Sequence, residues 1–395
     1  MDELKVYNTL SGKKERFRSL EHGKVTMFVC GPTVQGPMHL GHARTYSFYD
    51  IVARYLSHLG WKVDFLMNIT DIDERITIAA RESHLDPSTL ASRFTKSFLS
   101  DLKSLGITTV TRFEPVSLKI DEAIRQVSIL LERGMAYVAD GWVYFDTEKF
   151  PRFGQLSKQS RAQLALHPLE LSREKRNPID FSLWRPEVLI EGKWKSPWGT
   201  GSPGWHIQDT AVTLSAFGPQ YDIHGGAYEL IYPHHEAEIA QGESISGVAP
   251  MVRYWVHTHL LTMEGEKMSK SKGNVITVHD ALKKYSADEL RFYFLLNHYR
   301  TDMDLTGLSL AAERFNRLKR LLHSRKRRGK TDGYSKLLVP FHNAMSDDFN
   351  TPVAIRVIEQ MAARGSKEKD GTKANMILGA ASQALSLLGV LEIGK

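Results

Sequence analysis

The 395-residue chain carries 52 lysines and arginines against 45 aspartates and glutamates, a formal net charge of +7 at pH 7, and 42% of its residues are hydrophobic. This length allows two or three domains with ordinary cores, and no run approaches the roughly 18 consecutive apolar residues of a membrane span, so we expect no membrane association. The excess positive charge is consistent with a polyanionic partner such as nucleic acid, although many basic proteins bind none.

The N-terminus and the cysteine content indicate a compartment. The chain begins MDELK, without the basic and apolar regions of a signal peptide. Cys30 is the only cysteine in the sequence, which excludes an internal disulfide framework. Both observations predict a protein of the reducing cytoplasm.

The first predicted elements form a βαβ unit. The apolar, β-prone run 26–30 stops at a Gly-Pro pair and is expected to be a buried parallel strand. Helical spacing over 45–59 ends at Gly60, and residues 63–67 form a second predicted strand. Strand, turn, helix and strand in this order predict an α/β fold with a parallel, doubly wound sheet.

The pattern changes in the middle of the chain. Residues 141–145 have the pattern of a hairpin strand, and a polar stretch containing Pro and Trp follows to about residue 199. We interpret 117–200 as an insertion between two halves of the sheet, because strand signals resume at 220–224. After about Leu305 the spacing of apolar residues is helical to the end of the sequence.

A basic run interrupts this helical part. Residues 323–330 contain almost no apolar residue, and their cationic members are Arg325, Lys326, Arg327, Arg328 and Lys330. These cations could belong to a solvated helix end, where they interact favourably with the helix dipole. They could equally contact nucleic-acid phosphates. The sequence leaves both interpretations open.

The segment between the first strand and its helix is the first chemical motif, CGPTVQGPMHLGH at 30–42. Gly31 and Gly41 allow the backbone to come close to a ligand, and the N-terminal amides of the helix favour phosphate. His39 and His42 are expected to project toward the same place and donate to phosphate oxygens as charge develops. A chance H-x-G-H is common, so this motif alone does not establish a nucleotide site.

The second motif is EKMSKSKGN at 266–274, which has the composition of a mobile loop. It holds three lysines in six residues, and lysine is a long-armed cation suited to following a departing pyrophosphate. Alone, the segment could be an exposed basic loop. Both motifs in this order, about 230 residues apart on a parallel-sheet scaffold, favour a common nucleotide site.

With these motifs the sequence resembles the class I aminoacyl-tRNA synthetases, and specifically the cysteinyl-tRNA synthetase family. Further blocks cover nearly the whole chain in the family order: YNTL at 7–10, NITDID at 68–73, DFSLW at 180–184, PGWHI at 203–207, DIHGG at 222–226, PHHE at 233–236 and DDFNTP at 347–352. The resemblance implies a Rossmann-type catalytic domain in two halves, 1–116 and 201–255. It implies a connective insertion at 117–200, a stem-contact region with the KMSKS loop at 256–305, and an α-helical bundle at 306–395.

The resemblance also implies which residues form the site. Those implied in catalysis are His39, His42, Lys267 and Lys270. Those implied in ATP binding are Gly31, Thr33, His39, Gly41, His42, Lys267, Ser269 and Lys270. Those implied around the amino-acid substrate are Cys30, Thr70, Trp205, His224 and Glu229. The resemblance implies contact with tRNA only weakly, and for these residues: Arg325, Lys326, Arg327 and Arg328.

A zinc site follows from the same resemblance. The family holds zinc through two cysteines, a histidine and a glutamate, and Cys30 occupies the first ligand position. His234 and Glu238, four residues apart, are expected on one helix face. Zinc binds thiolate well and a serine hydroxyl weakly, so the metal would select cysteine without an editing step.

One zinc position departs from the family. Asp209 stands where the family has its second zinc cysteine. Because aspartate ligates zinc with the same formal charge as a thiolate, we expect Zn²⁺ to be retained by Cys30, Asp209, His234 and Glu238, with a weaker hold and a more Lewis-acidic metal. The alternative is a degraded site in which Asp209 faces water or a backbone amide.

The remaining departures are milder. Gln35 and Gly36 stand where the family usually has tyrosine and aspartate, and Ala227 replaces a third glycine. Glu229 replaces an aspartate that usually binds the substrate amino group. The sequence ends at Lys395, where bacterial members usually continue into a small anticodon-binding domain, so we expect anticodon reading to be reduced, absent or done by the bundle.

The resulting expectation is a two-step ligase. The carboxylate of cysteine attacks the α-phosphate of ATP, with Mg²⁺ accompanying the phosphates, and the aminoacyl group then passes to tRNA(Cys). We expect a monomer. One alternative is a mycothiol-type ligase that joins cysteine to an amino-sugar, which the block 41–46 and the basic run argue against. The other is a non-catalytic synthetase-like protein that binds nucleic acid.

Overall fold

The computed structural model describes residues 3–166, 174–186, 194–268, 273–324 and 335–391. Its centre is a five-stranded parallel sheet in the order β12-β11-β3-β4-β5. The strands are β3 (Lys24–Val29), β4 (Lys62–Ile69), β5 (Arg112–Pro115), β11 (Tyr221–Ala227) and β12 (Val252–Thr258). The predicted α/β class and the strands predicted at 26–30, 63–67 and 220–224 are therefore confirmed.

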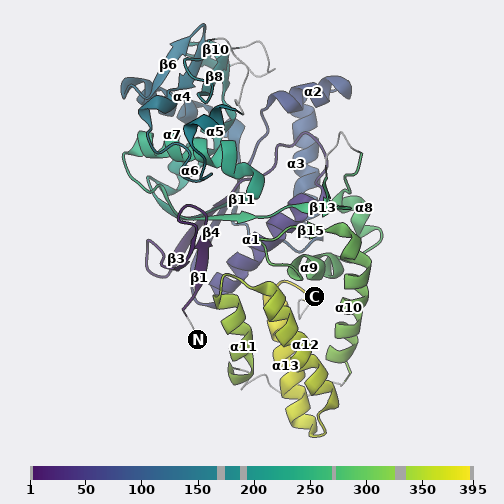
Figure 1. Ribbon diagram of the computed structural model, residues 1–395. Coiled ribbons are helices and arrows are strands. Elements are labelled where there is room, and N and C mark those ends of the chain that lie inside the picture. Colours follow the sequence, from purple (N-terminus) through teal and green to yellow (C-terminus); the bar gives the residue numbers. More distant parts are fainter. Residues whose placement is uncertain (1–2, 167–173, 187–193, 269–272, 325–334, 392–395) are drawn as a thin grey trace.

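The helix that follows β3 starts earlier than its apolar spacing predicts. Helix α1 spans Leu40–His58 and passes through the middle of the molecule (Figure 1). His39 caps its N-terminus by accepting from the amides of Gly41 and His42. The first turn is thus set by a side-chain cap rather than by apolar periodicity, which is why the spacing predicted a start only at residue 45.

The alternation of side chains along β3 divides the core into two clusters. Met27 and Val29 belong to a cluster that continues through α1 into the C-terminal helices. Phe28 and Cys30 belong to a second cluster, shared with the segment between β5 and β11. Because successive side chains of a strand point to opposite faces, this register places Cys30 on the side of the sheet that the inserted segment covers.

The segment between β5 and β11 forms a separate antiparallel sheet in the order β6-β7-β8-β10-β9. It lies at the upper left of Figure 1, away from the C-terminal helices. Its elements are α4 (Ile120–Glu132), β6 (Ala136–Ala139), β7 (Trp142–Phe145), α5 (Arg161–Ala165), β8 (Phe181–Pro186), β9 (Trp194–Ser196) and β10 (Gly199–Pro203). The hairpin strand predicted at 141–145 is confirmed as β7, paired with β6.

Smaller elements complete the part of the chain that surrounds the parallel sheet. A hairpin of β1 (Lys5–Asn8) and β2 (Lys13–Arg16) precedes the sheet, and β13 (Leu261–Met263), β14 (Glu266–Lys267) and β15 (Met303–Asp304) form a three-stranded sheet beyond it. The helices are α2 (Glu74–Glu82), α3 (Pro87–Ser104), α6 (Trp205–Phe217), α7 (Glu236–Ser246), α8 (Val278–Leu282) and α9 (Ala287–Leu295). None of the helices in the described ranges is long and apolar enough to cross a membrane.

Helices make up most of the described C-terminal residues, which lie at the bottom of Figure 1. These helices are α10 (Leu308–Leu322), α11 (Ser335–Ser346), α12 (Thr351–Lys367) and α13 (Gly371–Leu387). This agrees with the helical pattern predicted after Leu305. Their apolar residues join the same cluster as one face of the parallel sheet, so the bundle is packed directly on the part that contains this sheet.

Two buried carboxylates connect elements that are far apart in the sequence. Asp50 of α1 lies 2.6 Å from the Arg291 guanidinium of α9, and both side chains are almost fully buried. Asp348, just before α12, accepts from the backbone amide of Tyr7 at 2.7 Å and from Arg300 Nε at 2.8 Å. These contacts link α1 to α9, and they link β1 and the loop that follows α9 to the segment before α12, through hydrogen bonds to charged groups.

Candidate active site

A cavity of about 320 Å³ opens where the first strands of the parallel sheet end and α1 begins. Ligands of open α/β sheets bind at this edge. Residues 30–39 run along it almost without interruption. The sequence-predicted residues that line it are Cys30, Gly31, Thr33, His39, His42, Thr70, Trp205, Asp209, Glu229 and His234.

The two histidines of the first motif lie face to face at the start of α1. Their ring centroids are 3.7 Å apart and the planes differ by 19°. His39 Nδ1 accepts from the amide of Gly41 at 3.1 Å, so the ring proton is on Nε2. That nitrogen is then the hydrogen-bond donor, the form in which an imidazole contacts a phosphate oxygen.

Gly41 packs against the ring of His39. A Cβ atom at this position would lie 2.9 Å from His39 Cε1. Its amide already donates to His39, as does that of His42 at 3.4 Å. The residue therefore provides space for the histidine ring, and the first amides of α1 serve the cap.

The second motif is joined to the first through the backbone. Ile276 O accepts from the amide of Leu40 at 3.0 Å, and Val278 N donates to Met38 O at 2.9 Å. These bonds place the segment that follows the lysine loop against the start of α1. Met268 and Val275 line the same cavity as His39.

The lysine loop itself is only partly described. The backbone of Lys267 ends β14, paired with Thr262 of β13. Ser269 and Lys270 lie outside the described residues, as do Arg325, Lys326, Arg327 and Arg328. The roles predicted for these residues stay predictions.

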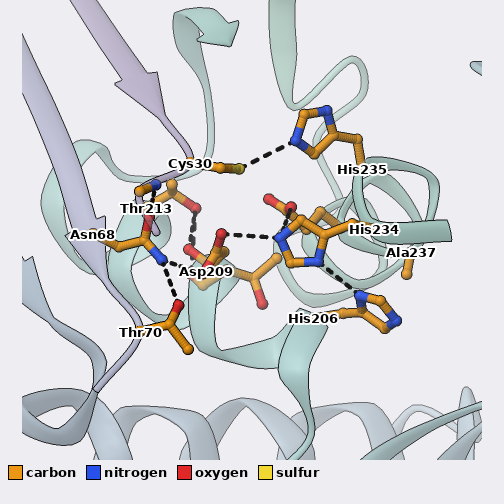
Figure 2. A network of polar contacts seen from close by, with 12 residues as sticks. Cys30, Asn68, Thr70, His206, Asp209, Thr213, His234, His235 and Ala237 are labelled. Carbon is orange, nitrogen blue, oxygen red and sulfur yellow. Dashed lines mark hydrogen bonds and ion pairs between the residues drawn. The ribbon is translucent and has the colours of Figure 1, made fainter. Parts of the chain in front are cut away.

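The four predicted zinc ligands converge at the wall of the cavity that Cys30, Asp209 and His234 line, and Figure 2 labels these three residues. One ligating atom from each of Cys30, Asp209, His234 and Glu238 lies within 4.8 Å of the others, and all four residues are buried. Nε2 of His234 is 3.0 Å from Asp209 Oδ2 and 3.1 Å from Glu238 Oε1. Asp209 thus faces the cluster, as the ligand hypothesis requires.

His234 reaches Glu238 from a different element than predicted. Helix α7 begins only at Glu236, and His234 belongs to a preceding π-helical turn, Ile231–His235. The four-residue spacing still brings the side chains together. The single-helix prediction is wrong, but its consequence for the site is unchanged.

Neighbouring polar groups orient this cluster. Asn68 Nδ2 donates to Asp209 Oδ1 at 2.8 Å, which leaves Oδ2 for His234. His206 Nδ1 lies 2.8 Å from Nδ1 of His234, so the outer nitrogen of His234 is held and Nε2 faces the carboxylates (Figure 2). In protein metal sites, the ligand atoms that face away from the metal are held by hydrogen bonds in the same way.

The electrostatics of the cluster fit a divalent cation. Burial raises the pKa of the Cys30 thiol, and Glu238 and Asp209 raise it further. Burial, followed by the charge of Asp209, also raises the pKa of Glu238. Neither Glu238 oxygen accepts a hydrogen bond from the described residues. Several buried acidic groups without full hydrogen bonding are costly, and a bound cation would remove that cost.

The predicted substrate residues separate into two groups. Trp205 stacks on His234 with centroids 4.2 Å apart, and Thr70 and Glu229 line the cavity. His224 does not line it. Instead, His224 Nε2 lies 3.4 Å from Cys30 Sγ, behind the cavity, so the prediction that His224 forms a wall of the substrate pocket is not supported.

The residues that sequence reasoning missed are mostly polar partners. Asn68 begins the block at 68–73, but nothing in the sequence around it marks it as the hydrogen-bond donor to Asp209. His235 follows His234, yet its Nε2 lies 3.1 Å from Cys30 Sγ, which the adjacent pair of histidines could have suggested. Arg44, used as part of a tRNA-enzyme block, is buried and donates to the backbone carbonyl of His259 at 2.9 Å. It is a structural residue.

The chain is similar to known proteins over nearly its whole length. Residues 16–314 match the family model described as the tRNA synthetases class I (C) catalytic domain, and residues 340–393 match the DALR domain. A cysteine–tRNA ligase of Thermoplasma acidophilum is 47% identical over 77% of the chain and 67% of its own length. Another, of Moorella thermoacetica, is 42% identical over 93% of the chain and 81% of its own length.

Solved structures show the same fold at low identity. The Mycobacterium tuberculosis methionyl-tRNA synthetase in complex with methionyl-adenylate superposes with a TM-score of 0.66, at 15% identity, over 92% of this chain and 90% of that one. A putative arginyl-tRNA synthetase of Campylobacter jejuni gives a TM-score of 0.59, at 14% identity, over 94% of this chain and 93% of that one. Both superpositions extend from the parallel sheet into the helical part.

Proposed function

The chain belongs to the cysteine–tRNA ligase family of class I aminoacyl-tRNA synthetases, and from this premise we propose that it activates cysteine with ATP and transfers it to tRNA(Cys). One observation carries the proposal. A single cavity is bordered by the stacked histidines, by residues on both sides of the lysine loop, and by Cys30, Asp209 and His234. A nucleotide site and a thiol-selective site thereby share one space.

The first step needs positioning and charge stabilisation. Nε2 of His39 is the donor of its ring, and the ring is fixed by the cap and by stacking on His42. A donor held in advance stabilises charge that develops on the α-phosphate as the carboxylate attacks. We place Lys267 and Lys270 at the departing pyrophosphate, with Mg²⁺ on the phosphates.

Substrate selection follows from the cluster. Cys30, Asp209, His234 and Glu238 would hold Zn²⁺, which would supply a Lewis-acid position for the thiolate of the substrate. Trp205 stacks on His234 and Thr70 lies beside Asn68, so both residues limit the space around that position. Glu229 lines the cavity and carries the charge that the substrate amino group requires.

The second step of the proposed reaction transfers the activated amino acid to tRNA. A terminal ribose hydroxyl of tRNA accepts the aminoacyl group and AMP leaves. The amino-sugar ligase is not favoured, because relatives that match 91% or more of the chain at 38–42% identity include cysteine–tRNA ligases. We place the protein in a reducing compartment. We also propose that it is a monomer, and sedimentation would test this oligomeric state.

The decisive experiment is cysteine-dependent ATP–pyrophosphate exchange followed by transfer. The purified protein should exchange pyrophosphate with cysteine and at least about 100-fold less well with serine. The charged amino acid should pass to tRNA(Cys) and not to glucosaminyl-inositol. Exchange without transfer to any tRNA would refute the ligase proposal, and no exchange with any amino acid would refute activation itself.

A further inference from the structure

We propose that Arg75 binds the carboxylate of the amino-acid substrate, a role that rests on the proposed function. Arg75 lies in the first turn of α2 and lines the same cavity as Cys30 and His39. It is the one arginine or lysine among the cavity-lining residues that the structure describes. The reacting end of the substrate is a carboxylate, and Arg75 is the permanent positive charge that this cavity offers to it.

The guanidinium of Arg75 is held in one place by its own helix. Its Nε donates to Asp73 Oδ1 at 2.8 Å, and its Nη2 donates to Asp73 Oδ2 at 3.0 Å, which is the planar fork that arginine forms with a carboxylate. Asp73 is itself fixed, because it caps α2 by accepting from the backbone amide of Arg75. A group that is ordered in advance loses little entropy when its ligand binds.

One end of the guanidinium remains for a ligand. Nη2 of Arg75 also donates to Thr33 Oγ1 at 3.0 Å. Nη1 has no hydrogen-bond partner among the residues that the structure describes. It carries two N–H donors, and guanidinium donors pair well with carboxylate oxygens. We assign these donors to the substrate.

Two contacts place Arg75 close to the proposed thiol position. Its guanidinium carbon lies 5.0 Å from the centroid of the Trp205 ring, within the range of a cation–π contact. The Trp205 ring in turn stacks on His234 with centroids 4.2 Å apart, so a single residue separates Arg75 from a proposed metal ligand. Thr33, which accepts from Arg75, forms a parallel bridge with Thr70 of the substrate pocket.

With Arg75, each polar group of cysteine has a partner in the cavity. The thiol would lie at the proposed zinc position, the ammonium group at Glu229 and the carboxylate at Arg75. Only the β- and α-carbons separate the thiol of cysteine from its carboxyl group, so these partners have to surround one small space. Glu229 and Arg75 both line the cavity, as this requires.

The arrangement also orients the carboxylate for its attack on ATP. Because Nη1 is the end of the guanidinium that remains, Arg75 would hold one carboxylate oxygen and leave the other to attack the α-phosphate. Fixing the nucleophile in this way lowers the entropic part of the barrier. Arg75 is thus a substrate-binding residue that acts in the first step.

A ligand that lacks the carboxylate tests this assignment. Cysteamine has the thiol and the ammonium group of cysteine but no carboxyl group. Both ligands are titrated into the zinc-loaded whole chain by isothermal titration calorimetry without ATP. We expect the wild type to bind cysteine about 10–100-fold more tightly than cysteamine, and Arg75→Ala to bind the two within about threefold of each other. Arg75→Lys keeps the charge but loses the fork, so it should retain part of the preference.

Arg112 provides a matched control. Its guanidinium pairs with Asp64 through Nε at 3.2 Å and Nη2 at 3.0 Å, and it lies 5.5 Å from the ring centroid of Phe217. Its side chain is 41% exposed, against 43% for Arg75, but it does not line the cavity. Arg112→Ala should therefore keep the full preference for cysteine over cysteamine. The melting temperature of each variant shows whether it is folded.

Other roles of Arg75 would give different results. If it only holds Trp205 in place, Arg75→Ala will weaken the binding of cysteine and cysteamine by the same factor, and the proposal is wrong. If it contacts the phosphates of ATP, the variant will bind ATP more weakly and keep its preference for cysteine, which also overturns the proposal. Equal affinities for the two ligands in an active wild type would do the same. A wild type that neither binds cysteine nor exchanges pyrophosphate would instead refute the proposed function.

Discussion

His234 Nε2 lies 3.0 Å from Asp209 Oδ2, and both side chains are buried. The family that the sequence resembles has a zinc cysteine at this position, so in the proposed site Asp209 would place a harder oxygen ligand where a sulfur is usual. Removing the Asp209 carboxylate should therefore weaken metal binding. We expect Asp209→Ala to bind Zn²⁺ at least about 100-fold more weakly than the wild type, measured by chelator competition.

The reverse substitution is more informative. Asp209→Cys should restore two thiolates and bind Zn²⁺ more tightly, with an additional thiolate charge-transfer band in the Co²⁺ form. Its preference for cysteine over serine in pyrophosphate exchange should equal or exceed that of the wild type. Unchanged zinc content in both variants would show that Asp209 is not a ligand.

Asn68 should act on the metal through Asp209. Its amide donates to Asp209 Oδ1 at 2.8 Å, while its Oδ1 accepts from the amide of Gly31 at 2.6 Å. Asn68→Ala should therefore lower zinc affinity by about 10–100-fold, because the carboxylate loses its fixed orientation. The control is Asn316→Ala, which removes a contact to Glu289 remote from the metal ligands. Equal zinc affinity in both variants would contradict this role.

How far the sequence predicts this site depends on the kind of residue. Strand β3 and helix α1 follow from apolar patterning, because burial imposes a period of two or 3.6 residues. Arg44 and His224 could not be placed in this way. Arg44 is a charged residue whose partners are backbone carbonyls, and the side that His224 faces depends on the register of β11 against β3. Partners brought together from distant strands leave no local pattern.

The Asp50–Arg291 pair should contribute strongly to stability. Both charges are buried at 2.6 Å, and Asp50 also accepts from the amide of Thr108 at 3.1 Å. Arg291→Leu would leave the carboxylate without its main partner, so the free energy of unfolding should fall by about 3–5 kcal/mol. The double variant with Asp50→Leu should recover part of this loss. Urea denaturation measures both, and an additive double variant would contradict the coupling.

The same pair predicts a pH dependence. Burial alone would raise the pKa of Asp50, but Arg291 and Arg54 hold it below its usual value in the folded chain. A lowered folded-state pKa means that the carboxylate stabilises the fold above its unfolded pKa of about 3.9, and that this stabilisation is lost as pH falls through the folded value. Wild type should therefore lose more unfolding free energy below about pH 4 than Asp50→Asn does. Parallel pH profiles of the two proteins would contradict this.

Gly41 and His39 allow a test of positioning in the first step. A Cβ atom at Gly41 would lie 2.9 Å from His39 Cε1 and 3.0 Å from Nδ1, so Gly41→Ala should displace the ring that we propose as the hydrogen-bond donor to the phosphate. We expect kcat for pyrophosphate exchange to fall by roughly 10–100-fold while the KM for cysteine changes little, because the cysteine-binding residues are untouched.

Gly371 provides the matched control. It is the first residue of α13, and a Cβ atom there meets no atom within 4 Å. Gly371→Ala should leave kcat unchanged and stabilise the chain slightly, by about 0.4–1 kcal/mol, since it removes freedom from the unfolded state. If Gly41→Ala retained full kcat, the fixed position of His39 would not be a requirement of the reaction. A similar loss of kcat in both variants would show that the effect of Gly41→Ala is not specific to its contact with His39.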